Sequence, residues 1–251
     1  MGSTRGPLVV LRLGAGHRSH RDTGVARRRT LPRAVQPGMM RSVPGDLRYL
    51  VHFFNDERFL FKPITMADVA EVDDVCNAIT SQKGWFWVRF SPLERRGYLA
   101  RRRFVEEAMY EDYTQRFGAL KEKVPVYFYL IPNLSERKAI ELARHRTRHD
   151  ETEPRVVMVE IEDLDDTRNV TFTLNDSHTA YRNRIMEAGL TFGGATDVRV
   201  ALPDHGKIFP FSMLEQVHQE YAPRHITYEV QIWDHHMVAK LRYVLLGTRG
   251  T

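Results

Sequence analysis

The 251-residue sequence contains a single cysteine, Cys76, which excludes an internal disulfide framework and a zinc site built on several cysteines. It also contains no run of 18 apolar residues, so it predicts no membrane-spanning helix and no membrane partner. Proteins with so little cysteine are typical of reducing compartments, and we therefore expect a cytoplasmic location.

Signatures of the common nucleotide and hydrolase sites are also missing. The sequence has no GxxxxGK[ST] phosphate loop, no GxGxxG dinucleotide fingerprint and no GxSxG nucleophile elbow. His235 and His236 are neighbours, and neighbouring side chains of a strand point to opposite faces. We therefore expect no metal site there and no metal cofactor elsewhere.

Positive charge is concentrated at the N-terminal end. Residues 1–41 contain nine arginines, no lysine and one acidic residue, Asp22. The chain has 37 Lys and Arg residues and 32 Asp and Glu residues in all, so 28 basic and 31 acidic residues, a net charge of −3, remain for 42–251. This excludes a globally basic nucleic-acid-binding domain and leaves only local basic patches.

The segment 1–39 is rich in Arg, Gly, Pro and Thr and shows no periodicity, so we expect a disordered tail outside the fold. Three interpretations of this segment stay open. The first is an organellar presequence, although its Gly and Pro residues disfavour the amphipathic helix that such sequences form. The second is a basic arm that binds nucleic acid. The third and simplest is an over-long gene start, with Met39 or Met40 as the true first residue.

Apolar periodicity divides residues 40–251 into short elements of both kinds. Helical spacing predicts helices over 66–80, 98–117, 136–148 (capped by Ser135), 176–190 and 212–221. Dense or alternating apolar runs predict strands over 47–54, 85–90, 124–131, 155–161, 169–173, 226–233 and 240–246. The two kinds do not alternate strictly, so the sequence predicts one α+β domain with a central mixed or antiparallel sheet flanked by helices.

An arginine cluster lies at the start of the long helix, made of Arg95, Arg96, Arg101, Arg102 and Arg103. Guanidinium groups suit phosphate and pyrophosphate, so the cluster is a candidate anion-binding site. A solvated helix face is the alternative interpretation. At least one of the three consecutive arginines must lean toward the apolar face of the helix.

The strand over 226–233 contains a carboxylate, Glu229. Alternation places Glu229, Gln231 and Trp233 on one face, and the apolar residues of 228–232 on the other. Since both faces carry apolar residues, a central strand is expected. A carboxylate in a central strand is costly unless it is paired or used in chemistry, which makes Glu229 a candidate catalytic residue. Exposure at a sheet edge is the alternative.

Taken in chain order, the segments LARRRFV, VPVYF with IPNL, RVVMVEI, TFTLNDSH, YEVQIW and KLRYVLL resemble the DNA ADP-ribosyltransferase toxins of the DarT type. In that family an Arg-bearing stretch precedes a VPFYF-like strand that ends in a Pro-containing turn. A late strand carries the catalytic Glu ahead of a final strand. The similarity covers about 95–246. It implies an ADP-ribosyltransferase-like fold that transfers ADP-ribose from NAD to a base in single-stranded DNA.

The resemblance also implies roles for individual residues. Glu229 and Arg102 take the catalytic positions. The residues placed at NAD are His52, Arg103, Tyr127 and Phe128. The residues placed at the nucleic acid are Arg89, Arg95, Arg96 and Arg101. The family opens with a His–Thr motif, and the corresponding LVHFF of this chain supplies His52 without the Thr.

Two alternatives of function stay open. One is an ADP-ribosyltransferase that modifies protein or RNA. The other is a non-enzymatic module that binds nucleic acid or an antitoxin protein through the basic helix. Enzyme and binding module differ in one structural respect, since only the enzyme requires Glu229 and an arginine from 101–103 to lie in the same site.

Overall fold

The computed structural model describes residues 43–54, 60–81, 90–147, 155–190, 202–224 and 226–247. All of them belong to one compact unit, Val35–Thr251. The expectations for residues 1–39 fall outside the described residues. No helix within the described ranges is long and apolar enough to cross a membrane.

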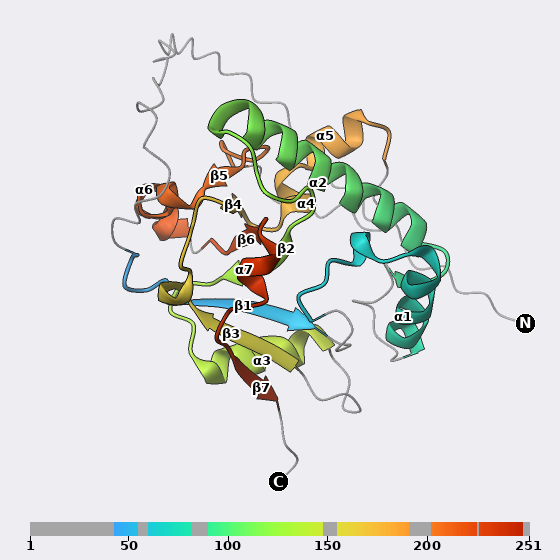
Figure 1. Ribbon diagram of the computed structural model, residues 1–251, viewed down its shortest axis with the longest axis horizontal. Coiled ribbons are helices and arrows are strands. Elements are labelled where there is room, and N and C mark those ends of the chain that lie inside the picture. The colour runs from blue at the N-terminus through green and yellow to red at the C-terminus, as the bar shows by residue number, and fades with distance from the viewer. Residues whose placement is uncertain are drawn as a thin grey trace, which may run out of the picture. The chain divides into compact units, whose positions relative to one another are not determined.

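The core of this unit is a seven-stranded sheet in the order β5-β4-β6-β2-β1-β3-β7 (Figure 1). Every neighbouring pair of strands is antiparallel. The strands are β1 Tyr49–Phe54, β2 Val126–Leu130, β3 Arg155–Glu160, β4 Val170–Leu174, β5 Phe209–Pro210, β6 Tyr228–Ile232 and β7 Val244–Gly247. The last-but-one strand of the chain, β6, thus lies between β4 and β2 near the middle of the sheet.

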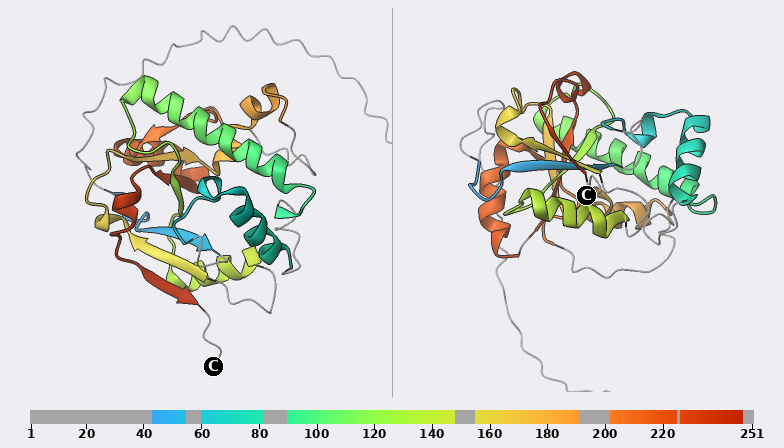
Figure 2. Two further views of the ribbon diagram at one scale, coloured as in Figure 1. Left: turned by 45° about the vertical axis from the view of Figure 1, so that its right-hand side comes forward. Right: turned by 90° about the horizontal axis from the view of Figure 1, so that it is seen from below.

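Helices cover both faces of the sheet. They are α1 Val69–Ser81, α2 Arg95–Phe117, α3 Glu136–Thr147, α4 Ser177–Ala180, α5 Arg182–Glu187, α6 Leu214–Tyr221 and α7 His235–Val238. Short 3-10 turns lie at Ile64–Met66, Ile161–Asp163, Phe211–Met213 and Ala222–Arg224. On one face α6 and α7 pack on the main core, and on the other α2 lies near β2, β4 and β6. On that second face α3 lies beside β3 (Figure 2). Its small residues Ala139 and Ala143 belong to a buried cluster with residues of β1 and β3.

Strand alternation decides which side chains meet α2. In β6, Tyr228, Val230 and Ile232 enter the main core beneath α6. Glu229 and Gln231 point to the opposite face, where Trp233 packs with α2 residues such as Met109. All residues of β6 are buried, so a carboxylate is held inside the sheet, beneath the long helix.

The predicted α+β class and the central sheet are confirmed, and the sheet is antiparallel. The predicted segments correspond to β1, α1, α2, β2, α3, β3, β4, α6, β6 and β7, and Ser135 caps α3 through a hydrogen bond from the Lys138 amide. The helix expected over 176–190 is two short ones, α4 and α5, and β7 begins only at Val244. The strand expected over 85–90 lies outside the described residues except for Phe90, and the two-residue β5 was not predicted.

Candidate active site

Glu229 lies on β6 opposite Thr173 of β4 and Tyr129 of β2. Its side chain is only 2% exposed, so the carboxylate is shielded from bulk water. Its Oε1 atom accepts a hydrogen bond of 3.2 Å from the Ser177 amide, and it lies 3.9 Å from Nη1 of Arg102. The same oxygen of a buried carboxylate therefore lies near both a backbone amide and a guanidinium.

The turn after β4 directs the Ser177 amide at Glu229. Asn175 adopts the left-handed backbone conformation, with φ of 61°, which Asn tolerates better than most residues. Its carbonyl accepts from the Glu229 amide, so the turn is anchored on β6. Asp176 then caps α4 by accepting from the Thr179 amide and hydroxyl. Asn175 and Asp176 thus form a turn and a helix cap, the roles that Asn and Asp favour.

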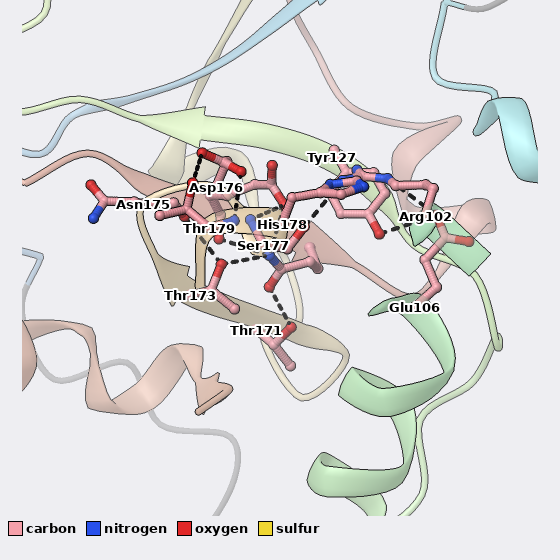
Figure 3. A network of polar contacts seen from close by, with 12 residues as sticks. Arg102, Glu106, Tyr127, Thr171, Thr173, Asn175, Asp176, Ser177, His178 and Thr179 are labelled. Carbon is pink, nitrogen blue, oxygen red and sulfur yellow. Dashed lines mark hydrogen bonds and ion pairs between the residues drawn. The ribbon is translucent and has the colours of Figure 1, made fainter. Parts of the chain in front are cut away.

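Arg102 lies beside Tyr127 and Glu106 in the polar cluster and contacts residues from three elements (Figure 3). Its guanidinium carbon lies 3.4 Å from the centre of the Tyr127 ring, so the two planar groups are in direct contact. Nη1 donates to the Ser177 hydroxyl at 3.1 Å and lies 3.3 Å from Nδ1 of His178. Because arginine can only donate, Nδ1 must be the acceptor, which places the proton of a neutral His178 on Nε2.

Glu106 holds the other edge of the guanidinium. It lies one helical turn after Arg102 on α2, and its Oε1 is 3.4 Å from Nε of Arg102. The same oxygen accepts a hydrogen bond of 3.1 Å from the Tyr127 hydroxyl. Arg102 is therefore fixed along its Nε edge by Glu106, on its face by Tyr127 and at Nη1 by the turn of Ser177 and His178.

Burial dominates the protonation of this cluster. Loss of hydration raises the pKa of both Glu229 and Glu106, and the positive charge of Arg102 offsets part of that rise. Burial also acts to lower the Arg102 pKa, but the acidic groups around it, including Tyr127 and Glu229, raise it on balance. Burial likewise raises the Tyr127 pKa far above its ordinary value. Arg102 is therefore charged and Tyr127 neutral at physiological pH.

The composition of the cluster limits its chemistry. One guanidinium and two carboxylates carry a net charge of −1 when all three are ionised, and in that state the cluster attracts positive charge. Carboxylates with raised pKa values near a single cation are suited to proton transfer and to stabilising a developing cation. Within the ranges described, no three His, Cys, Asp or Glu side chains form a group that could hold a metal ion.

Three of the residues singled out from the sequence meet in this cluster, namely Glu229, Arg102 and Tyr127. Phe128 points to the opposite face and is part of the main core. His52 lies against Phe54, Phe61 and Phe128 on that same side. Its Nδ1 donates to the backbone carbonyl of Tyr127 at 2.7 Å. The structure does not bring the side chains of His52 and Phe128 to Glu229.

The predicted arginine cluster separates into two groups. Arg95, Arg101 and Arg102 are buried, whereas Arg96 and Arg103 are exposed. Desolvation lowers the pKa of Arg101, as burial of a cation should. Of the predicted cluster, Arg96 and Arg103 thus have exposed side chains on α2, while Arg89 lies outside the described residues.

Arg95 ties α1 to the start of α2. Its guanidinium donates to Asp73 and Asn77 of α1, each at 2.6 Å, and to the Phe90 carbonyl at 3.1 Å. We expect Arg95→Gln to lower the free energy of unfolding by about 1–3 kcal/mol, because it removes a buried, charge-assisted network. Arg96→Gln, on the adjacent exposed position, should change it by less than about 0.5 kcal/mol. Urea unfolding of both variants tests this, and equal stabilities would contradict it.

Three residues of the cluster were not predicted from the sequence, namely Glu106, Ser177 and His178. Glu106 could have been found from its i,i+4 spacing after Arg102, since such pairs meet on a helix. Ser177 and His178 follow Asn175 and Asp176, and turn formation and helix capping are a sufficient explanation for such a polar segment. Their approach to Arg102 depends on how α4 and α2 pack, which no local pattern reveals.

Comparison of the chain with protein-family models, with curated proteins and with solved structures found no match. The function is therefore inferred from the geometry of the cluster and from the resemblance of the sequence segments.

Proposed function

We propose that this protein is an NAD-dependent ADP-ribosyltransferase with an ADP-ribosyltransferase-like fold, and that it modifies a base in single-stranded DNA as a toxin. The observation that carries the proposal is the contact between Arg102 of α2 and Glu229 of β6, at 3.9 Å within a buried cluster. These are the two residues that the resemblance to DarT-type toxins assigned to catalysis. They are 127 positions apart in the sequence, so their meeting is a property of the fold.

The cluster fits the reactive end of NAD by its charge. Bound NAD would supply an ADP-ribosyl group whose anomeric carbon becomes cationic as its bond to the nicotinamide nitrogen breaks. Glu229 and Glu106 provide negative charge in a site that excludes water, where such a cation is stabilised most. Because Glu106 and Glu229 already offset its charge, Arg102 is better suited to orienting Glu229 than to binding the pyrophosphate.

Glu229 also has the protonation behaviour of a general base. The acceptor must lose a proton as its bond to the anomeric carbon forms, and nicotinamide leaves with the electrons of the broken bond. Burial raises the pKa of Glu229, which strengthens it as a base. The proton of the acceptor therefore passes to the Glu229 carboxylate.

A nucleic-acid acceptor is supported by the exposed arginines of α2. Arg96 and Arg103 are seven positions apart, so they share one side of the helix. We expect the double variant Arg96→Gln/Arg103→Gln to weaken binding of single-stranded DNA. The slope of log K against log salt should become shallower by about 0.7 for each phosphate that the variant no longer neutralises. Fluorescence anisotropy at several salt concentrations measures both, and an unchanged slope would show that neither arginine contacts the backbone.

The assay for the activity presents labelled NAD with single-stranded DNA, RNA or total cell protein in turn. We expect nicotinamide release and label on the DNA. Label on RNA or on protein would instead establish the same chemistry with another acceptor. Folded protein that releases no nicotinamide with any acceptor would refute the enzyme and support a module that binds nucleic acid or an antitoxin.

A further inference from the structure

A row of buried polar side chains on β4 and β6 lies next to Glu229. Thr171 and Gln231 are directly paired across these strands, as are Thr173 and Glu229. Thr171, Thr173, Gln231 and Trp233 are all fully buried. Four polar side chains without access to water need a reason to be there, because burying a polar group is costly unless its hydrogen bonds are made.

Each hydrogen bond in this row has a defined donor, starting from Trp233. The Trp233 indole nitrogen can only donate, and it donates to the Thr171 hydroxyl oxygen at 2.8 Å. The Thr171 hydroxyl in turn donates to Oε1 of Gln231 at 3.0 Å. Oε1 of Gln231 thus faces Thr171, and the Nε2 group must face the other way.

The Nε2 group of Gln231 consequently faces Glu229. It donates to the Thr173 hydroxyl at 3.2 Å and to the Glu229 carbonyl at 3.0 Å, and it lies 3.5 Å from Oε1 of the Glu229 carboxylate. If the amide were turned over, Oε1 of Gln231 would face the carboxylate and repel it. The Thr171 hydroxyl would then lose the acceptor of its proton, and the Glu229 carbonyl would lose its donor.

We propose that Thr171 is a positioning residue. Together with Trp233 it sets the direction of the Gln231 amide, and so keeps a hydrogen-bond donor beside the Glu229 carboxylate. None of the described contacts of Thr171 is with Arg102 or with the Glu229 carboxylate, so Thr171 acts through Gln231. The consequence for catalysis rests on the proposed function, but the effect on the ionisation of Glu229 does not.

Several other charged or titratable groups lie around Glu229 and Arg102, and the Thr171 substitutions alter none of these side chains. They are Arg102 and Glu106 on α2, Tyr127 on β2, and Asp176, at the turn before α4, together with His178. A change in the ionisation of Glu229 on mutating Thr171 can therefore be assigned to the reoriented or unfixed Gln231 amide.

The test compares Thr171→Val, which keeps the shape and removes the hydroxyl, with Thr171→Ser, which keeps the hydroxyl. Glutamate labelled with carbon-13 at the side-chain carboxyl allows Glu229 to be titrated by NMR, with its signal assigned from Glu229→Gln. We expect Thr171→Val to move the midpoint of the Glu229 titration upward, by up to about one pH unit, because the partial positive charge on Nε2 of Gln231 would no longer be fixed 3.5 Å from the carboxylate. Thr171→Ser should restore the parent midpoint, and the acid limb of the transferase pH profile should move in parallel.

Each outcome is decisive. An unchanged midpoint in Thr171→Val, or an equal shift in Thr171→Ser, overturns the positioning role. A shifted midpoint in a protein that transfers no ADP-ribose supports the positioning role while refuting the proposed function. If Thr171→Val does not fold, Trp233→Phe removes the donor that orients Thr171 and should shift the midpoint in the same direction, and no shift there overturns the inference.

Discussion

Replacing Glu229 with Gln should lower the turnover of ADP-ribosyl transfer by roughly 10²–10³ or more, the scale typical of losing one preorganised electrostatic partner. Gln keeps the size of the side chain and an oxygen that can accept from the Ser177 amide. It removes the negative charge that would stabilise a cationic ribose and the base that would take the acceptor's proton. The affinity for NAD should stay within a few-fold, because the charge is needed chiefly in the transition state.

Two controls make the result interpretable. Glu107→Gln removes a carboxylate from the exposed side of α2, next to Glu106, and should leave turnover unchanged. Thermal unfolding of Glu229→Gln should show no large loss of stability, since a buried charge with a raised pKa has been replaced by a neutral group. A Glu229→Gln variant with the turnover of the parent would show that another residue is the catalytic carboxylate, and that the resemblance assigned this role to the wrong position.

The face on which Glu229 lies was predictable from the sequence, since it follows from strand alternation alone. Val230 and Ile232 place apolar side chains on one face of the sheet, and Trp233 places one on the opposite face. Both faces of this strand therefore had to be covered by other parts of the fold. The long helix was predictable for a similar reason, because Val105, Met109 and Tyr113 recur at helical spacing and are buried in the structure. These features are local, and local patterns decide them.

The composition of the cluster was less predictable, because it depends on how distant segments pair. His52 and Tyr127 were both expected at NAD, but they lie on opposite faces of adjacent strands, and the register of β1 on β2 decides this. Arg95 was expected at a nucleic acid, but its guanidinium is used by Asp73 and Asn77 of a preceding helix. A sequence shows that such residues are available, whereas packing decides which partners they reach.

Replacing Arg102 with Gln should have the largest effect on stability. The substitution leaves Glu106 and Glu229 buried without the guanidinium that offsets their desolvation, and it removes the contact with the Tyr127 ring. Breaking a buried ion pair by removing one partner typically costs about 3–5 kcal/mol. Arg103→Gln, at the next and exposed position, is the matched control and should change the free energy of unfolding by less than about 0.5 kcal/mol.

The deficit should depend on pH, and its sign follows from the raised pKa values of the two carboxylates. An acid whose pKa is higher in the folded state contributes most stability below its unfolded pKa, near the ordinary 4.5, and that stability falls away as pH rises through the folded value. Arg102 lowers both folded values, so its removal raises them further and extends the decline to higher pH. The deficit of Arg102→Gln relative to the parent should therefore be small near pH 4.5 and grow toward pH 8. Urea unfolding of the parent and of Arg102→Gln across this pH range measures the deficit. The double variant Arg102→Gln/Glu106→Gln should recover part of it. A deficit independent of pH would show that Arg102 stabilises the fold by packing alone.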